Sequence, residues 1–286
     1  MFEFPKQWDI PLADWIDRLM DWVLTEFADF FDAIGIILLK VLLSLENFFL
    51  WLPWFLVLIL VGILAWRAMG RWWYGFIIPG LFFIIGCFGY WDMAMMTLAI
   101  VAAAVIISLI IGIPTGIVMA RSNLAENLIR PVLDAMQTMP SFVYLIPALM
   151  LFGLGKVPAV FATIIYAVPP VIRLTNVGIR GVPESVIEAA EAFGSNPRQI
   201  LFNVQLPLAF PSIMVGVNQT TMMALAMVVV ASMIGARTLG LEVLLAINRI
   251  EIGRGFEAGL SIVLLAIIID RITHGFAVKQ QKSYKI

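Results

Sequence analysis

Cysteine and histidine are almost absent from this chain of 286 residues. It contains one cysteine, Cys87, and one histidine, His274. A single cysteine excludes an intrachain disulfide, and one cysteine with one histidine is too few for a structural zinc site. We therefore predict no metal site and no cofactor in this chain. Cys87 lies in an apolar run, and we expect it to be packed as a small hydrophobic residue.

Charged residues are also scarce. They make up 13% of the chain, whereas 62% of the residues are hydrophobic and the mean hydropathy is +1.00. An ordinary soluble domain is close to half apolar, so this composition predicts an integral membrane protein. The net charge of −1 gives no indication of a nucleic-acid partner.

Long apolar runs predict several membrane-spanning helices, judged against the roughly 20 apolar residues that a bilayer requires. Two runs are short and rich in proline, which is tolerated at membrane depth mainly where a helix is buried in protein or lines a cavity. We expect these two, 140–154 and 157–172, to line a pathway. Gly112 and Gly116 have the spacing of a close helix contact. The predicted spans are Trp51–Trp66, Trp73–Tyr90, Met93–Ala120, Pro140–Leu154, Val157–Ile172, Leu208–Ile234 and Gly259–Ile272.

The first 33 residues predict an acidic amphipathic helix at the membrane interface, because Trp15, Leu19 and Trp22 recur at helical spacing opposite aspartates. The next apolar run, 34–50, contains Lys40 and Glu46, which make a lipid-exposed span costly. Two alternatives stay open for this run, an interfacial helix or a true span. They place the N-terminus on opposite sides of the membrane.

A mostly polar insert at 183–207 separates two apolar segments. Pro183 suits a first helical turn and Gly194 suits the left-handed position after a helix, which predicts a helix from about 183 to 193. Ser195 is then expected to cap a second helix, which begins at Pro197 and runs toward a break at Pro207. The first helix has two stripes, an acidic one of Glu184, Glu188 and Glu191 and an apolar one of Val186, Ala190 and Phe193.

The insert resembles the EAA motif of ABC importer permeases, in which E-A-A is followed by three residues, a glycine, nine residues and I-x-L-P. The matching residues are Glu188, Ala189, Ala190, Gly194, Leu206 and Pro207, with Val204 in place of the usual isoleucine. From about residue 11 to residue 271, the chain is also similar to the permease subunits of the glycine betaine/proline betaine (quaternary amine, osmoprotectant) importers. The stretches that carry this second resemblance are 132–145, VPPVIRLT at 168–175, and 217–219.

The resemblance implies an all-α polytopic fold, the ABC type I importer transmembrane fold, with about six to eight membrane helices plus an N-terminal amphipathic helix. It implies a homodimer of the permease, two copies of an ABC ATPase subunit carrying ATP and Mg, and an extracytoplasmic substrate-binding protein. The cargo that it implies is glycine betaine or a related quaternary amine. The predicted regions are the interfacial helix (1–33), accessory membrane helices (34–91), the importer core (92–278) with its coupling insert (183–207), and a basic cytoplasmic tail (279–286).

Arginine and lysine predict the orientation. If the insert is cytoplasmic, eleven of these residues between Arg67 and Lys285 fall inside and four fall outside, as the positive-inside rule requires. We therefore expect a multi-pass protein of the bacterial cytoplasmic membrane with the insert and the C-terminus in the cytoplasm. The stretch 236–258 is then the longest external segment and a candidate surface for a delivering protein, with a solvated loop as the alternative.

No G-x-x-x-x-G-K-[ST] phosphate-binding loop is present in the sequence, so we predict that the chain is not an enzyme and relies on a partner ATPase. The glutamates of the insert lack a partner base or metal ligand, which favours docking over catalysis. All nine tryptophans lie in the first 91 residues, which argues against a tryptophan cage for a quaternary amine in the pathway. The pathway candidates are Met136, Phe142, Tyr144, Tyr166, Asn218 and Gln219, with helix packing as the alternative for Met136 and the aromatic residues.

Other functions stay open at this point. The same architecture would serve an ABC permease for another small solute, such as methionine or an alkanesulfonate. An ion-coupled secondary carrier would need ionisable residues within its spans, and the clearer core spans contain few. A membrane scaffold without transport activity is the remaining alternative.

Overall fold

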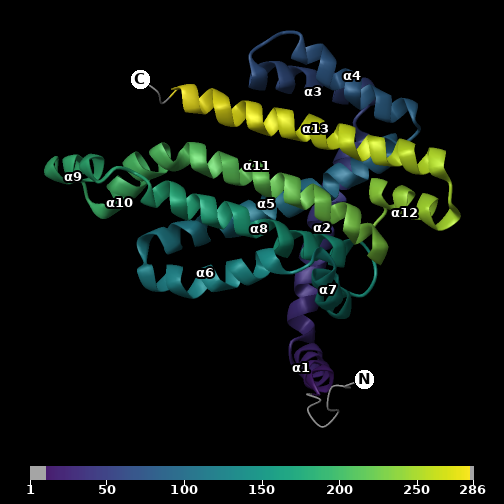
Figure 1. The fold of residues 1–286 in the computed structure, drawn as a ribbon, viewed down its shortest axis with the longest axis horizontal. Coiled ribbons are helices and arrows are strands. Elements are labelled where there is room, and N and C mark those ends of the chain that lie inside the picture. Colours follow the sequence, from purple (N-terminus) through teal and green to yellow (C-terminus); the bar gives the residue numbers. More distant parts are fainter. Residues whose placement is uncertain (1–10, 284–286) are drawn as a thin grey trace, which may run out of the picture.

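The protein is almost entirely helical in the computed structural model, which describes residues 11–283 and the side chains of residues 11–277. No β-strand occurs within residues 11–283 (Figure 1). Residues 1–10 of the predicted interfacial helix, and the side chains of the predicted basic tail at 279–286, lie outside this described part. The elements are α1 (Leu12–Glu26), α2 (Ala28–Trp51), α3 (Trp54–Met69), α4 (Tyr74–Cys87), α5 (Trp91–Arg121), α6 (Asn123–Thr138), η2 (Ser141–Tyr144), α7 (Leu145–Phe152), α8 (Lys156–Arg180), α9 (Glu184–Ala192), α10 (Pro197–Gln199), η3 (Ile200–Gln205), α11 (Leu206–Ala231), η4 (Ser232–Ile234), α12 (Leu239–Arg249) and α13 (Ile252–Ser283).

Three long helices, α5, α8 and α11, form the centre of the protein. α8 packs closely on both of the others, and α11 runs in the opposite direction to α8 (Figure 1). Glycines permit the close approach of α5 to α8. A Cβ atom on Gly116 would lie 2.6 Å from the Cβ of Thr175 and 2.7 Å from the carbonyl oxygen of Ile172, and one on Gly112 would overlap Val171. The close helix contact that the spacing of the two glycines predicts is confirmed.

The α3–α4 hairpin lies against α13, on the opposite side of α13 from α11 (Figure 1). Gly275 allows this contact, since a Cβ atom there would lie 2.9 Å from the Cβ of Ala68. The prediction that Cys87 is packed was wrong, because Cys87 is exposed at the end of α4. A helix that is apolar on all sides can be surrounded by lipid, so an apolar residue on it needs no burial within the protein.

α1 extends away from the other helices, whereas α2 packs against α5 and α8 and runs across the direction of α8, α11 and α13 (Figure 1). None of the 15 residues of α1, all of which the structure describes, is buried. The tryptophans Trp15 and Trp22 are exposed on this helix, as an interfacial amphipathic helix requires. α2 has the length and composition of a span. Its crosswise direction suits an interfacial helix, so both alternatives for 34–50 remain.

Five helical segments are long and apolar enough to cross a membrane: α2, α5, α8, the run Pro197–Ile234 and the run Ile252–Ala277. A sixth is the pair formed by α6 and Ser141–Phe152, which is bent by 112°. The shorter helices α3 and α4 are also apolar. The predicted fold class, an all-α polytopic membrane protein, is confirmed.

The run 140–154, predicted as a short, proline-rich span, does not form one continuous helix. It consists of a 3₁₀ turn, η2, and the short helix α7, and the chain bends sharply between α6 and this pair. Pro140 directly precedes η2 with an extended backbone at ψ 139°. Proline has no N–H to continue a helix and disfavours the helical conformation in the residue before it, so α6 ends at this point.

An ion pair fastens α2 to the core. Lys156 Nζ, at the start of α8, donates to the two carboxylate oxygens of Glu46 at 2.6 and 2.7 Å. Glu46 is 7% exposed, so its charge faces protein rather than lipid. The cost that the sequence assigns to this charge is therefore offset by a partner 110 residues away.

We expect Lys156→Met to lower the stability of the protein by roughly 3 kcal/mol, since it leaves Glu46 buried without its partner. Unfolding temperature in detergent measures this loss. The control is Lys40→Met, which removes an exposed lysine from α2, the helix that carries Glu46. Adding Glu46→Gln to Lys156→Met should recover part of the loss, and equal melting temperatures for the two lysine variants would contradict the prediction.

Candidate coupling site and translocation pathway

The predicted insert forms a helix and a tight turn at one end of the molecule (Figure 1). α9 begins directly after Pro183, and Gly194 follows the helix with a φ of +80°. The N–H of Gly194 donates to the carbonyl of Glu191 at 2.8 Å, and the N–H of Ser195 donates to the carbonyl of Ala190 at 3.0 Å. These two bonds make a Schellman motif, which places glycine in the left-handed conformation.

Asn196, rather than Ser195, caps the second helix. Its side chain accepts from the N–H of Arg198 and of Gln199 at 3.1 and 2.9 Å, and the Gln199 side chain accepts from the N–H of Asn196 at 2.9 Å. This reciprocal capping box is a stronger arrangement than the expected single cap. The predicted break at Pro207 is absent, because the π-helical turn η3 leads directly into α11. A π turn bonds residues five apart, so the pattern of bonds is already shifted where proline lacks its N–H.

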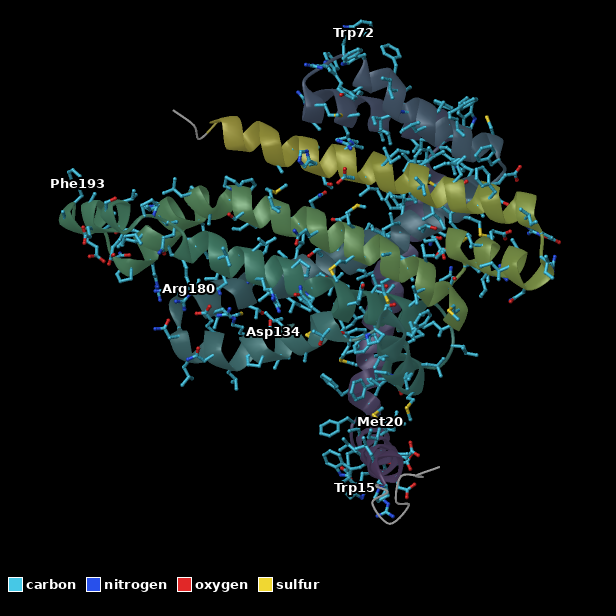
Figure 2. The ribbon with its side chains drawn as sticks, in the orientation of Figure 1. Trp15, Met20, Trp72, Asp134, Arg180 and Phe193 are labelled. Carbon is cyan, nitrogen blue, oxygen red and sulfur yellow. The ribbon has the colours of Figure 1, made fainter. Side chains whose placement is uncertain are left out.

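The surface of the insert is exposed at its tip and anchored at its base. Phe193 is 92% exposed and projects from the end of the molecule (Figure 2). None of the nine residues of α9, all of which are described, is buried, so Glu188, Ala189 and Ala190 all lie on an unburied helix. At the base, Leu206 packs partly buried against a small core cluster, and Pro207 is partly buried beside it. An exposed aromatic side chain with carboxylates around it is typical of a protein interface.

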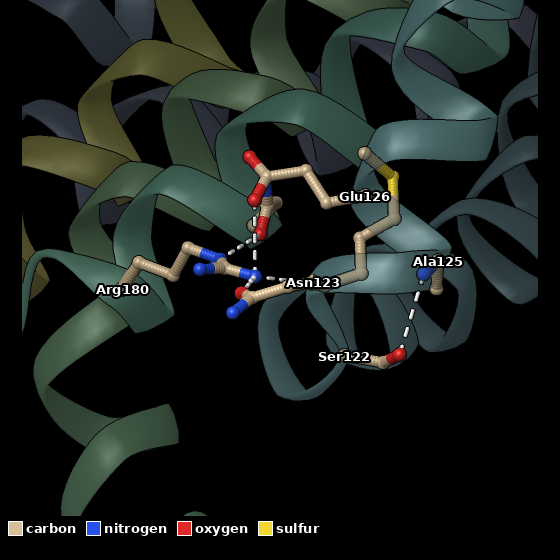
Figure 3. Close-up of polar contacts among 7 residues, drawn as sticks. Ser122, Asn123, Ala125, Glu126 and Arg180 are labelled. Carbon is tan, nitrogen blue, oxygen red and sulfur yellow. Dashed lines mark hydrogen bonds and ion pairs between the residues drawn. The ribbon is translucent and has the colours of Figure 1, made fainter.

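A polar cluster at the end of α8 was not predicted (Figure 3). Arg180 Nη2 lies 3.0 Å from the Glu126 carboxylate and 2.9 Å from both the Met119 carbonyl and Asn123 Oδ1. Arg180 Nε donates to Asn176 Oδ1 at 3.1 Å. The Asn176 amide in turn donates to Glu126 at 3.1 Å, which closes the ring of contacts.

This cluster belongs to a ladder between α6 and α8. Arg173 pairs with Asp134 about two turns away on the same two helices. Between the two pairs lies a cavity of about 170 Å³ lined by residues that include Glu126, Arg130 and Arg173. The signal for the ladder was present in the sequence as polar positions 173, 176 and 180 on one face of α8 and 126, 130 and 134 on one face of α6.

The structure brings three of the pathway candidates together. The Tyr144 hydroxyl donates to the Met136 carbonyl, and the Tyr144 and Tyr166 rings meet edge to face with centroids 5.7 Å apart. Phe142 is exposed next to them in η2. Tyr144 itself is buried, and its contacts join α6, η2 and α8 in this conformation.

The remaining two pathway candidates, Asn218 and Gln219, lie on α11. Asn218 faces α13, where its amide donates to Asp270 at 3.2 Å and its oxygen accepts from the Thr273 hydroxyl. Gln219 is the next residue and is exposed. Asn218 is therefore not with the tyrosines, because its side chain joins a polar contact on a different face of α11.

The opposite end of the molecule is formed by α12 and the start of α13 (Figure 1). Glu242 is buried and accepts from Arg254 Nη2 at 2.6 Å. Tyr90 lies beside this pair, and its burial raises the pKa of its phenol. The tip between the two helices is apolar, with Ile250 and Ile252 exposed and Ile250 in the left-handed conformation at φ 58°. Within 236–258, the candidate surface for a delivering protein, Glu242 therefore stabilises the fold, while Ile250 and Ile252 face outward.

Comparison with known proteins identifies relatives along nearly the whole chain. The glycine betaine/proline betaine transport system permease protein ProW of Escherichia coli is 48% identical over 266 residues, which cover 92% of this chain and 74% of ProW. The glycine betaine transport system permease protein OpuAB of Bacillus subtilis is 46% identical over 272 residues, which cover 95% of this chain and 96% of OpuAB.

Among solved structures, a chain from inward-facing conformations of the MetNI methionine ABC transporter aligns with a TM-score of 0.58 and 19% identity over 66% of this chain and 94% of that chain. An identity this low shows a shared fold alone. The family model described as binding-protein-dependent transport system inner membrane component matches residues 112–280, which include the end of α5, the whole of α8 and α11, and the insert. The chain therefore belongs to this family, the membrane-spanning components of ABC importers.

Proposed function

We propose that this chain is the permease subunit of an ATP-driven importer of glycine betaine or a related quaternary amine osmoprotectant. The observation that carries the proposal is identity of 46 to 48% with two glycine betaine permeases over more than nine-tenths of the chain. The match to a methionine transporter chain has 19% identity, so it does not favour methionine as the cargo. The chain would form the translocation pathway and have no ATPase site of its own.

The insert 183–207 would couple this permease to its ATPase. Glu188, Ala189, Ala190 and Gly194 lie on α9 or its closing turn, exposed at one end of the molecule. We assign Phe193 to this docking surface as an aromatic anchor. Leu206 and Pro207 would instead fix the base of the insert to α11. Two ATPase subunits would bind ATP and Mg, and this chain would need neither.

A second copy of the chain would complete the transporter. The α6 helix presents Leu124, Leu128 and Val132 on one face, and each is more than half exposed. Beyond the bend that follows α6, Phe142 in η2 and Ile146 in α7 are also apolar and more than half exposed. Because α6 carries charged residues on its opposite face, the apolar stripe suits a protein surface better than a membrane-spanning lipid contact. We infer a homodimer with this face turned toward the shared pathway.

The insert and the C-terminus would lie in the cytoplasm. Arg121 ends α5 and Arg180 ends α8, and both helix ends lie toward the end of the molecule that carries α9 (Figure 1). Such clustering fits the positive-inside rule. The apolar tip around Ile250 would then face outward and receive an extracytoplasmic binding protein.

Uptake of radiolabelled glycine betaine tests the cargo. The permease is reconstituted in proteoliposomes with its ATPase and its binding protein, and uptake is measured with and without enclosed ATP. We expect uptake that requires ATP and is competed by unlabelled betaines but not by methionine. Competition by methionine or an alkanesulfonate would contradict the cargo assignment, and uptake by the permease alone without ATP would indicate a secondary carrier.

A further inference from the structure

The polar cluster around Arg180 lies between the proposed docking surface and the candidate pathway. We propose that Arg180 is a positioning residue that fastens the coupling insert to α6, so that the insert and the pathway end of α6 move as one body. This inference rests on the proposed role of the insert in coupling. It adds a route by which movement of α9 reaches the interior of the membrane.

Arg180 is the last residue of α8, and α9 begins four residues later at Glu184. The link between the helices is short and partly fixed. The N–H of Gly181 donates to the Val177 carbonyl at 2.8 Å, and Val182 is buried. A displacement of α9 would therefore act on Arg180 through very little flexible chain.

The guanidinium of Arg180 contacts three oxygens on two other helices, α5 and α6. Its Nη2 contacts the Met119 carbonyl in the last turn of α5, Asn123 at the start of α6, and Glu126 one turn further on. Two N–H bonds thus serve three oxygens, while Nε holds Asn176 on α8 itself. A planar guanidinium with several directed donors suits this arrangement, whereas a lysine ammonium would keep the charge with fewer fixed directions.

These polar contacts matter because few buried side chains attach α6 to the rest of the protein. Leu133 is the one buried residue among its 16 residues, all of which are described. The far end of α6 bears the carbonyl of Met136 that accepts from Tyr144. Ten residues of helix separate Glu126 from Met136, which corresponds to about 15 Å. α6 can therefore act as a rod with Arg180 at one end and the buried Tyr144 at the other.

A purely structural role for Arg180, closing the C-terminal end of α5 through the Met119 carbonyl, would predict a different outcome. It would lower stability and leave the ratio of transport to ATP hydrolysis unchanged in the molecules that still fold. The coupling role predicts a change in that ratio. The two roles are separated by measuring both activities in the same vesicles.

The test compares Arg180→Gln, Arg180→Lys and Glu126→Gln in proteoliposomes that contain the complete transporter. We expect Arg180→Gln to retain its ATPase subunit and most of its ATP hydrolysis, while betaine uptake per ATP falls roughly threefold to thirtyfold. Glu126→Gln should cause a fall in the same direction, and combining it with Arg180→Gln should add little, since both remove one contact. Arg180→Lys should restore part of the betaine uptake per ATP. It also provides the test if Arg180→Gln does not fold.

The matched control is Arg121→Gln, which removes an exposed arginine from the same corner of the molecule and should leave the ratio unchanged. Uptake and hydrolysis that fall in equal proportion in Arg180→Lys and Glu126→Gln, or an unchanged ratio in all variants, would overturn the inference. If the unmodified permease itself fails to bind an ATPase, the proposed function fails instead. The two failures are thus distinguishable.

Discussion

A permease with Gly194→Val should lose most of its ATPase, whereas one with Gly194→Asn should keep it. Gly194 closes α9 at a φ of +80°, and a Cβ atom there would meet no other described heavy atom within 4 Å. The effect of a side chain is therefore conformational rather than steric within the permease. The left-handed conformation costs an ordinary residue roughly 1–2 kcal/mol and a β-branched residue more, while asparagine tolerates it.

That conformational cost translates into affinity. If valine drives the turn out of the left-handed region, the population of the docking conformation of α9 falls about tenfold or more. The apparent affinity for the ATPase then falls by the same factor. The measurement is the amount of ATPase that co-purifies with each variant, followed by ATP-driven uptake. Asparagine is the control because it too adds a side chain at the same place. Equal loss in both variants would show that the partner rejects any side chain there, and full retention in Gly194→Val would contradict the docking role of the turn.

The backbone of the insert could be predicted because its signals are local. Pro183 and Gly194 specify a helix start and a helix end through their own backbone preferences, independent of the rest of the fold. The structure has both features at the predicted positions. The choice of Asn196 over Ser195 as a cap, and the π turn that leads past Pro207, depend on how the second helix joins α11. Local preference does not determine that junction.

The polar contacts between helices could not be predicted from the sequence, because the two partners of each contact are far apart along the chain. Glu46 and Lys156 are separated by 110 residues, and Arg173 and Asp134 by 39. Each charged residue taken alone indicates either a residue that is costly within the membrane or a residue in a loop. Once its partner is known, the same residue is recognised as half of an ion pair between two helices. The same applies to Asn218, a pathway candidate from its motif, whose side chain bonds Asp270 on α13.

Two kinds of attachment therefore hold the helices together. α5, α8 and α11 meet through small residues and apolar surfaces, which give close and rigid contact. α6 is attached mainly by ion pairs and hydrogen bonds along α8. Polar contacts of this kind can be exchanged for others at modest cost, whereas a glycine-mediated helix contact cannot shift without loss of packing. This difference fits the proposal that directed polar contacts, and not close packing, transmit movement of the insert to α6.

Gly116→Leu should prevent the protein from reaching a stable folded state. The nearest atoms to a Cβ on Gly116 include the carbonyl oxygen of Ile172 at 2.7 Å, which belongs to the backbone of α8 and cannot rotate away. α5 and α8 would have to separate along a contact that also includes Gly112. Inserting such a side chain into a packed interior typically costs about 1–3 kcal/mol, and a backbone obstacle places this substitution at or above the top of that range.

Gly80→Leu is the matched control, since Gly80 lies in the membrane helix α4 and a Cβ there would meet no other described heavy atom within 4 Å. Both variants add the same apolar side chain to a membrane helix, so they change hydropathy and helix propensity equally. We expect Gly80→Leu to be purified as the unmodified protein is, and Gly116→Leu to aggregate or to melt at a much lower temperature in detergent. Gly112→Ala should lie between them, because the Val171 side chain that obstructs it has more freedom than a backbone carbonyl. Equal melting temperatures for Gly116→Leu and Gly80→Leu would mean that α5 and α8 are not held at the distance described and do not form a rigid centre.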